Sequence, residues 1–346
     1  MIDFRYHLVS IVAVFLALAI GIVFGATALK GAVISGLDTV SKHEAAVNRS
    51  LYLHNSQLKN QISADQTFAQ AAEGSLLHGL LDGQRVVLVL APGADSTTVD
   101  GVTTALGKAG AVVTGQVALS SQFFDTSPAT EEQLKTVTGT AAKLLPAGMT
   151  LPQTTLDPQI SGQQAAAQVI AAAIMTKDAL LPTLTAQQSQ QVMTEFANAG
   201  FLQINGVNGN AALAGQATMA VVVLPATVPP AKTAVPFNLA LVSLTQDFQE
   251  ASKGALLAGA LKGSGPHSAI DAVVNGSAGV TLTTVDNAET VTGQIIVAQA
   301  LRELLKPHPT PTAYGVRPNA APSPAPSPVA SPSVSTSPSS RKKSKK

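Results

Sequence analysis

The chain has 346 residues, of which 46% are hydrophobic and only 12% charged, and its 21 basic and 20 acidic residues give a net charge of +1. So few charges exclude a disordered chain or a nucleic-acid coat, and the lack of cysteine excludes disulfides, thiolate metal sites and cysteine nucleophiles. Five basic residues lie within 341–346, so the rest of the chain is mildly acidic and nucleic acid is not an expected partner.

The segment from Leu8 to Leu29 predicts a transmembrane helix, which makes residues 1–30 a membrane anchor. It carries no charge, and its only polar side chains are Ser10 and Thr27. A hydrocarbon core of roughly 30 Å needs about 20 helical residues, so length and composition both fit. A cleaved signal peptide is the alternative, because residues 26–28 read Ala-Thr-Ala. The apolar stretch is longer than the roughly 7–15 residues of a signal sequence, which favours retention.

One face of this helix carries only small residues at a spacing of four: Ala13, Ala17, Gly21 and Gly25. Such a face lets two helix backbones approach closely, and the two glycines match the GxxxG pattern. We predict helix self-association, the alternative being that Ala and Gly are simply frequent in membrane helices.

The orientation of the span in the membrane is a separate prediction. The charges that flank the span are nearly balanced, but the low charge of the rest of the chain suits an envelope protein. We therefore expect the amino terminus inside and the bulk outside.

Residues 31–82 are predicted to form a helical stalk or coiled coil. No proline occurs before Pro92, and apolar residues recur at alternating intervals of seven and four: Val40, Val47, Leu51, Leu58, Ile62 and Ala69. This 11-residue period keeps one apolar stripe on one side of a nearly straight helix. The stripe must be buried, either against a second copy or against the following domain, and the sequence leaves both open.

Residues 83–306 are predicted to form a Rossmann-like α/β domain. Short β-branched runs alternate with helical segments of 10 to 15 residues, which indicates a doubly wound, mostly parallel sheet. Thr185 and Gln188 form a capping box that opens one of the helices. Strands are expected at 85–91, 111–117, 201–205, 218–224, 255–261 and 280–285, and helices at 98–108, 131–145, 162–175, 185–200, 238–251 and 289–305.

Residues 307–346 are predicted to be a disordered tail. Ten of the 21 prolines lie between Pro307 and Pro338, among Ser, Ala and Thr, and such a segment buries too little apolar surface to order itself. The basic end either attracts anionic lipid or stays solvated.

Few residues suggest chemistry. The metal candidates are His43, His54 and His267, but no two histidines have the spacing of three or four that joins ligands on a helix. His43 and His54 lie on the same side of a helix, about 16 Å apart, so they would share a site only between copies packed in register. No methionine cluster, phosphate loop or nucleophile elbow occurs. The sequence therefore predicts no catalytic residue, no cofactor-binding residue and no enzyme.

Asp286 and Asn287 follow a predicted strand, where open α/β sheets usually contact ligands. A cap for the last helix is the alternative interpretation of these two residues.

The opening residues Asp3, Phe4, Arg5, Tyr6 and His7, running into the apolar segment, resemble the actinobacterial copper transporter family that includes mycobacterial MctB. Asp286-Asn287, together with Tyr314-Gly315 beyond the last helix, resembles that family's C-terminal signature. The resemblance covers residues 1–316. It implies an envelope protein that limits intracellular copper, with copper as the transported ion, an outer-membrane location and a pore-forming role.

We therefore predict a membrane-anchored envelope protein of copper homeostasis, similar to copper efflux and transport proteins, that acts as a homo-oligomer. Its partners would be the lipid bilayer, further copies of itself and copper ions. The alternative is a structural or adaptor protein whose α/β domain binds a partner or a cell-wall component without transporting metal. The residues themselves do not predict a pore, because one apolar span with two hydroxyl groups cannot line an aqueous channel.

Overall fold

The computed structural model describes residues 4–152, 160–178, 180, 182–206 and 212–324. The chain divides into two compact units, Met1–Thr67 and Phe68–Lys346. We call the second unit the head. The predicted basic end of the tail, at residues 341–346, lies outside the described residues.

Helix α1 runs without interruption from Phe4 to Leu77, so the predicted anchor and the helical part of the stalk are one helix. It contains no proline, and it ends before Gly79 and Gly83, whose φ values of 72° and 73° favour glycine. The segment Tyr6–Thr27 is long and apolar enough to cross a membrane, and none of it is buried.

The head is built on one seven-stranded sheet in the order β3-β2-β1-β4-β5-β6-β7. All neighbouring strands are parallel except β2 and β3, which are antiparallel. The central strands are continuous apolar runs because helices cover both faces of the sheet. The strands are β1 Arg85–Leu90, β2 Val112–Leu119, β3 Leu202–Gly206, β4 Met219–Val223, β5 Gly254–Ala258, β6 Thr283–Val285 and β7 Ala313–Tyr314.

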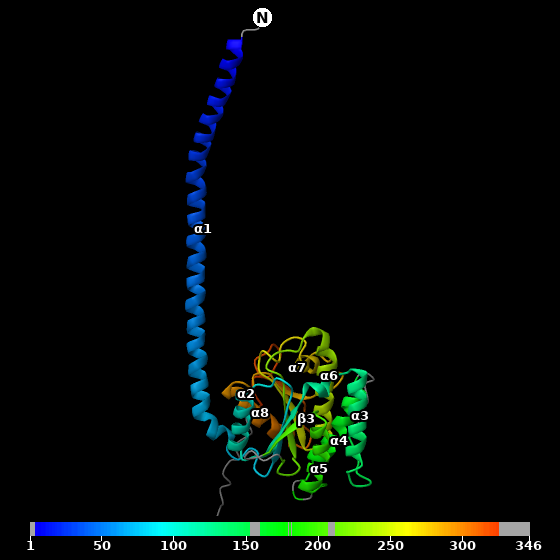
Figure 1. Ribbon diagram of the computed structural model, residues 1–346. Coiled ribbons are helices and arrows are strands. Elements are labelled where there is room, and N and C mark those ends of the chain that lie inside the picture. The colour runs from blue at the N-terminus through cyan, green and yellow to red at the C-terminus, as the bar shows by residue number, and fades with distance from the viewer. Residues whose placement is uncertain (1–3, 153–159, 179, 181, 207–211, 325–346) are drawn as a thin grey trace, which may run out of the picture. The chain divides into compact units, whose positions relative to one another are not determined.

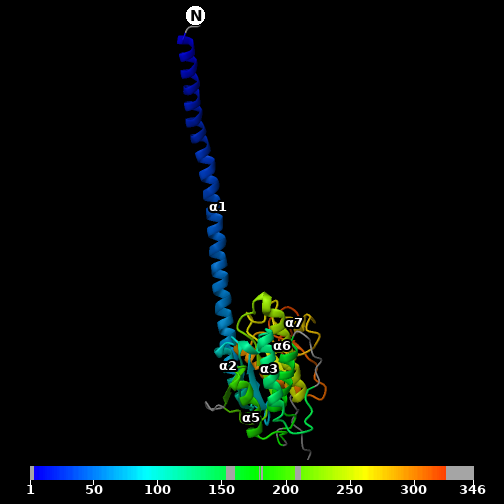
Figure 2. The same cartoon turned by 45° about the vertical axis from the view of Figure 1, so that its right-hand side comes forward.

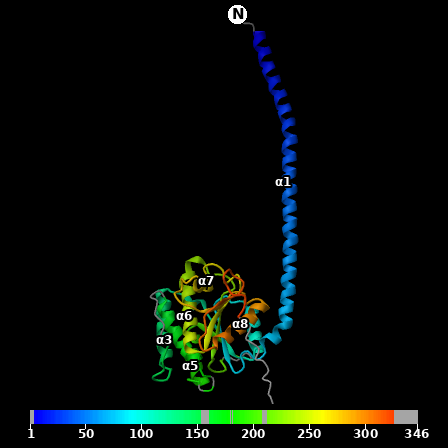
Figure 3. The same ribbon diagram turned by 180° about the vertical axis from the view of Figure 1, so that it is seen from behind.

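Two helical layers cover this sheet (Figure 1). The first layer comprises α2 Ser96–Lys108 and α8 Val291–Leu304, and the last turn of α1 packs in the same layer. The other layer comprises the 3-10 turn Ser121–Phe124 and the helices α3 Pro128–Ala142, α4 Ser161–Ile174, α5 Ala186–Asn198, α6 Ala231–Ala251 and α7 Ala269–Val274. Figure 2 shows α3, α5 and α6 on the same side, and Figure 3 shows both layers from behind.

The end of α1 belongs to the head. Leu77 and Leu81 are buried in the same core as α2 and α8, and the Leu81 N–H donates to the carbonyl of Ala109 at 2.8 Å. Glu73, also buried, pairs with Lys108 at 2.6 Å. The predicted stripe therefore has two parts, because its last member, Ala69, packs against this core while Val47, Leu51, Leu58 and Ile62 are between 43% and 58% exposed.

The predicted fold class is confirmed, and so is the capping box, in which Thr185 accepts from the Gln188 N–H. The structure differs from the predicted elements in three places. Helix α6 begins at Ala231, not at 238, so it continues through Pro236, which lies in its second turn and cannot donate a backbone hydrogen bond there. Helix α7 was not predicted. Strand β7 pairs with β6, so the structured head continues past residue 306 to Pro324 and only residues 325–346 remain beyond it.

Candidate functional site

The N-terminal signature lies at the start of the apolar span. Tyr6 and His7 are both exposed on the first turns of α1. Phe4 and Arg5 are part of the helix, and Asp3 lies outside the described residues. Tyrosine at the end of an apolar span is typical of the bilayer interface, where the ring contacts lipid and the hydroxyl group contacts water. These residues therefore fit a membrane boundary.

The predicted small-residue face lies along the same span. Ala13, Ala17 and Gly21 are exposed, and Gly25 is nearly so. A Cβ atom built on Gly21 or Gly25 would meet nothing within 4 Å. The backbone at these glycines is thus open to a second helix, but self-association remains a prediction.

The three histidine candidates do not form a ligand group. His43 and His54 are exposed on α1, and His267 is exposed before α7. Within the described ranges, no three His, Cys, Asp or Glu side chains lie close enough to hold a metal ion. The fold uses the backbone of His267, at a φ of 67°. Its N–H donates to Asp271 Oδ2 at 2.9 Å, and its carbonyl accepts from Asn238 Nδ2 at 2.7 Å.

Asp286 fixes the turn that follows β7. This buried carboxylate accepts the N–H of Val316 at 2.9 Å and the N–H of Arg317 at 3.1 Å. Gly315 has a φ of 135°, and a Cβ atom there would lie 2.0 Å from Asp286 Oδ1. Asp286 therefore requires a glycine at position 315, because any side chain there would overlap the Asp286 carboxylate.

The remaining signature residues are structural parts of the same sheet edge. Tyr314 is buried in β7, and the buried Asn287 accepts the N–H of Thr290 through its carbonyl at 3.0 Å. The interpretation of Asp286 and Asn287 as caps of the last helix was wrong. Thr290 caps it, accepting the N–H of Gly293 at 3.0 Å.

The turn held by Asp286 brings Arg317 to Asp271. Arg317 Nη2 lies 2.9 Å from Asp271 Oδ1, and both side chains are mostly buried. Burial raises the pKa of Asp271. The hydrogen bonds from Arg317 and from the His267 N–H, together with the positive charge of Arg317, have the opposite effect and are stronger in sum, so the pKa of Asp271 lies below its usual value. The fold therefore favours the ionised carboxylate, and this contribution to stability is lost as the pH falls through the lowered pKa.

Sequence reasoning missed this ion pair because its partners are 46 residues apart. Only the places of the two residues in the predicted order of strands could have indicated the ion pair. Asp271 follows β5 and Arg317 follows β7, and parallel strands end at a common edge of the sheet, where ligands usually bind.

A different cavity lies at the switch point between β1 and β4, where doubly wound sheets commonly bind nucleotides. It has a volume of about 290 Å³ and is lined by Pro92, Gly93 and residues of the segment 225–237. None of the described residues that line it is charged, and its four prolines have no N–H to offer a phosphate. This cavity does not support a nucleotide site.

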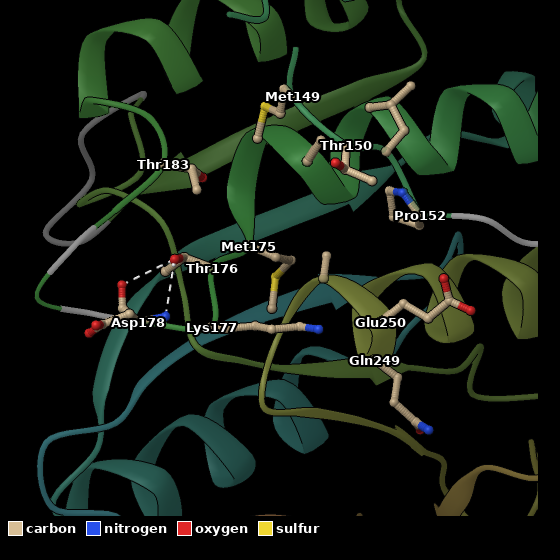
Figure 4. A pocket seen from close by; sticks show the side chains of 13 residues that line it. Met149, Thr150, Pro152, Met175, Thr176, Lys177, Asp178, Thr183, Gln249 and Glu250 are labelled. Carbon is tan, nitrogen blue, oxygen red and sulfur yellow. Dashed lines mark hydrogen bonds between the residues drawn. The ribbon is translucent and has the colours of Figure 1, made fainter.

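A cavity of about 710 Å³ lies where α4 and α6 end (Figure 4). Met149 and Met175 both line it, although they are too far apart in sequence to form a recognisable methionine motif. Met175 is almost fully buried in the core, and Thr176 hydrogen-bonds with the backbone of Asp178. Met175 thus fills the core, Met149 packs against it, and two thioethers alone do not make a copper site.

Comparison with known proteins gives a family match over most of the chain. A family model described as "Copper transport outer membrane protein, MctB" matches residues 1–324. The copper transporter MctB of Mycobacterium tuberculosis (strain ATCC 25618 / H37Rv) is 28% identical over 313 residues, covering 88% of this chain and 93% of the relative. The copper transporter MctB of Mycobacterium leprae (strain TN) is 29% identical over 307 residues, with the same coverage.

Proposed function

The chain belongs to the MctB family of copper transport outer membrane proteins, and from this premise we propose that it is held in the cell envelope by the span Tyr6–Thr27 and helps to keep copper out of the cell. The observation that carries the proposal is the family match, which begins at residue 1 and includes the apolar span. In this proposal copper ions are the transported cargo. This part of the proposal rests on the family alone, because it was implied by the resemblance of the sequence and is now supported by the family match.

The head lies outside the cytoplasm in this proposal, with the amino terminus inside. The body of the chain carries few charges, as suits an envelope domain, and long domains cross the membrane largely regardless of flanking charge. The span offers only the hydroxyl groups of Ser10 and Thr27, so it anchors the protein and does not line a channel.

Copper content tests the function directly. A strain that lacks the gene should accumulate more copper and tolerate less of it, because the export route is weakened. The intact chain should restore both properties. Copper content is measured by elemental analysis of washed cells. Unchanged content and tolerance in the deletion strain would remove copper export from the account.

We also propose that the protein acts as a homo-oligomer through α1. Two faces support this: the open small-residue face of the span, and the exposed apolar residues Val47, Leu51, Leu58 and Ile62. Apolar side chains repeated with one period along a helix are buried most simply against an identical stripe, since each copy then meets the same pattern.

Changing Leu58 to Asp should separate the copies. Leu58 lies on the stripe, and a carboxylate there would have to be buried without a partner, which costs far more than leaving it in water. The matched control is Leu53→Asp, because Leu53 is also exposed but lies off the stripe. Chemical cross-linking in native membranes should give oligomers for the wild type and the control, and monomers for Leu58→Asp. Equal cross-linking of both variants would contradict the proposal.

A second candidate function is an adaptor whose head binds a cell-wall component. The histidine and carboxylate side chains of the described residues form no metal-binding group, whereas two cavities with polar side chains in their walls lie at the carboxyl edge of the sheet. Equilibrium dialysis of the detergent-solubilised chain against Cu(I), Cu(II) and nucleotides separates the candidates. Binding of copper supports transport, and binding of none of the three supports the adaptor.

A further inference from the structure

The strongest unassigned site lies at the carboxyl edge of the sheet, between α7 and the turn after β7. It is a cavity of about 210 Å³ lined by Asp271, Thr284, Asp286, Arg317 and Asn319, among others. These residues come from a helix, a strand end and the turn after β7. In doubly wound sheets this edge is the usual side for ligands.

Two buried polar atoms at this cavity have no hydrogen-bond partner among the described residues: Thr284 Oγ1 and Arg317 Nη1. Thr284 is only 1% exposed, so its hydroxyl group is not satisfied by bulk solvent. The other guanidinium nitrogen, Nη2, is taken up by Asp271. Buried polar atoms almost always have partners, so a donor and a hydroxyl group left together at one cavity indicate a polar occupant.

The charges at the cavity decide what kind of occupant fits. The carboxylates of Asp271 and Asp286 repel an anion, although Arg317 and Thr284 offer it donors. A cation is attracted by the two carboxylates, but it offers no acceptor to the unpartnered Arg317 Nη1. A neutral molecule with hydroxyl groups meets both demands, because each hydroxyl donates one hydrogen bond and accepts two.

The wall of the cavity is already formed. Asp286 holds the N–H groups of Val316 and Arg317, and the Gly315 N–H donates to the carbonyl of Ala321 at 2.9 Å. Asn319 adopts a left-handed φ of 68°. A preformed wall loses little entropy when a ligand binds.

A second cavity lies on the other side of α7. It has a volume of about 380 Å³, and Asn238, Asp271 and Asn275 are among the residues that line it. Asp271 thus borders both cavities.

The size of the cavity at Thr284 and Arg317 limits its occupant. Its volume of about 210 Å³ is below the roughly 300–1,000 Å³ of sites for drug-sized ligands, so it is suited to a single small ring.

We infer that the cavity at Thr284 and Arg317 binds one sugar unit of a neutral saccharide. This inference deepens the adaptor function, since it names a class of cell-wall component, and it does not depend on copper transport.

Saturation-transfer NMR on the full chain in detergent tests the inference. The probes are glucose and N-acetylglucosamine, with acetate and inorganic phosphate as anions. We expect signals from at least one sugar and none from the anions. Sugar signals that are absent, or anions that bind instead, would overturn the inference, because the orphan atoms would then be satisfied by water or by an anion.

Variants assign the binding to this cavity. Thr284→Val keeps the shape and removes the hydroxyl group, so sugar affinity should fall about two- to tenfold, as expected for one lost hydrogen bond. Thr281→Val is the matched control, because Thr281 is exposed and does not line the cavity. Asn319→Gly removes a second polar side chain and tolerates the left-handed backbone, so it serves if Thr284→Val does not fold. Wild-type affinity in the folded variants would overturn the assignment.

This test is separate from that of copper export. Sugar binding with unchanged copper content in the deletion strain would support the adaptor alone. Altered copper content without sugar binding would support export and overturn this inference.

Discussion

Replacing Val14 and Leu18 by arginine is expected to release the protein from the membrane. Both side chains are exposed within the span Tyr6–Thr27, which in the proposed anchor lies in the hydrocarbon core of the bilayer. An arginine near the centre of a span costs about 2.5–3.5 kcal/mol of insertion free energy, so the pair costs about 6 kcal/mol or more. Carbonate extraction of membranes, followed by detection of the protein in the wash, measures this effect.

The control for this variant carries the same number of arginines outside the span. Leu53→Arg and Leu76→Arg both replace exposed residues of α1 beyond Thr27. This double variant should stay in the membrane fraction, because added charge alone does not remove the anchor. Retention of the Val14 and Leu18 variant in membranes would show that another part of the chain holds the protein there.

Replacing Phe248 by alanine is expected to cost the head a large part of its stability. Phe248 is fully buried in the core between α6 and the sheet. Large-to-small changes of this kind cost about 3–5 kcal/mol, because they lose apolar burial and leave a cavity. For a domain of this size the melting temperature should fall by about 6–20 °C. Thermal unfolding of the purified chain, followed by circular dichroism, measures the change.

Phe68→Ala is the matched control, because Phe68 is 75% exposed. Its substitution should change the free energy of unfolding by less than about 0.5 kcal/mol. If both variants melt at the same temperature as the wild type, the core described between the sheet and α6 is wrong.

The main elements of the fold could be predicted because local signals and tertiary packing agree. The runs at β1 and β4 are apolar along their whole length, as strands covered on both faces must be. The capping box at Thr185 marks a helix start through chemistry confined to four residues. In each case the residues that carry the signal are also the residues that form the element.

The missed elements lack such local signals. Strand β7 has only two residues, too few to show any period, and it exists because β6 offers a free edge. Helix α7 has six residues after a glycine-rich segment that is typical of a turn. The early start of α6 was hidden by Pro236, which more often ends or kinks a helix.

The candidate site was predictable only in part. Asp286 and Gly315 could be named from the sequence, but the reason for their pairing is a three-dimensional contact between two strand ends. Thr284 looks like any β-branched strand residue, and its unpartnered hydroxyl group emerges only when the strand is buried. Arg317 lies within residues 307–346, which composition assigns to the tail, and only the sheet edge gives it a partner.

The proposed function requires that the first apolar segment remains part of the mature protein and holds the α/β head outside the cytoplasm. The chain has no cysteine, so Ser96→Cys places a single thiol at an exposed position of the head. Intact cells are treated with a membrane-impermeant maleimide, and the protein is then extracted from carbonate-washed membranes and weighed by mass spectrometry. We predict a labelled chain that still contains residues 6–27. A chain that begins after Ala28, or one that is labelled only after the cells are broken, would contradict the account.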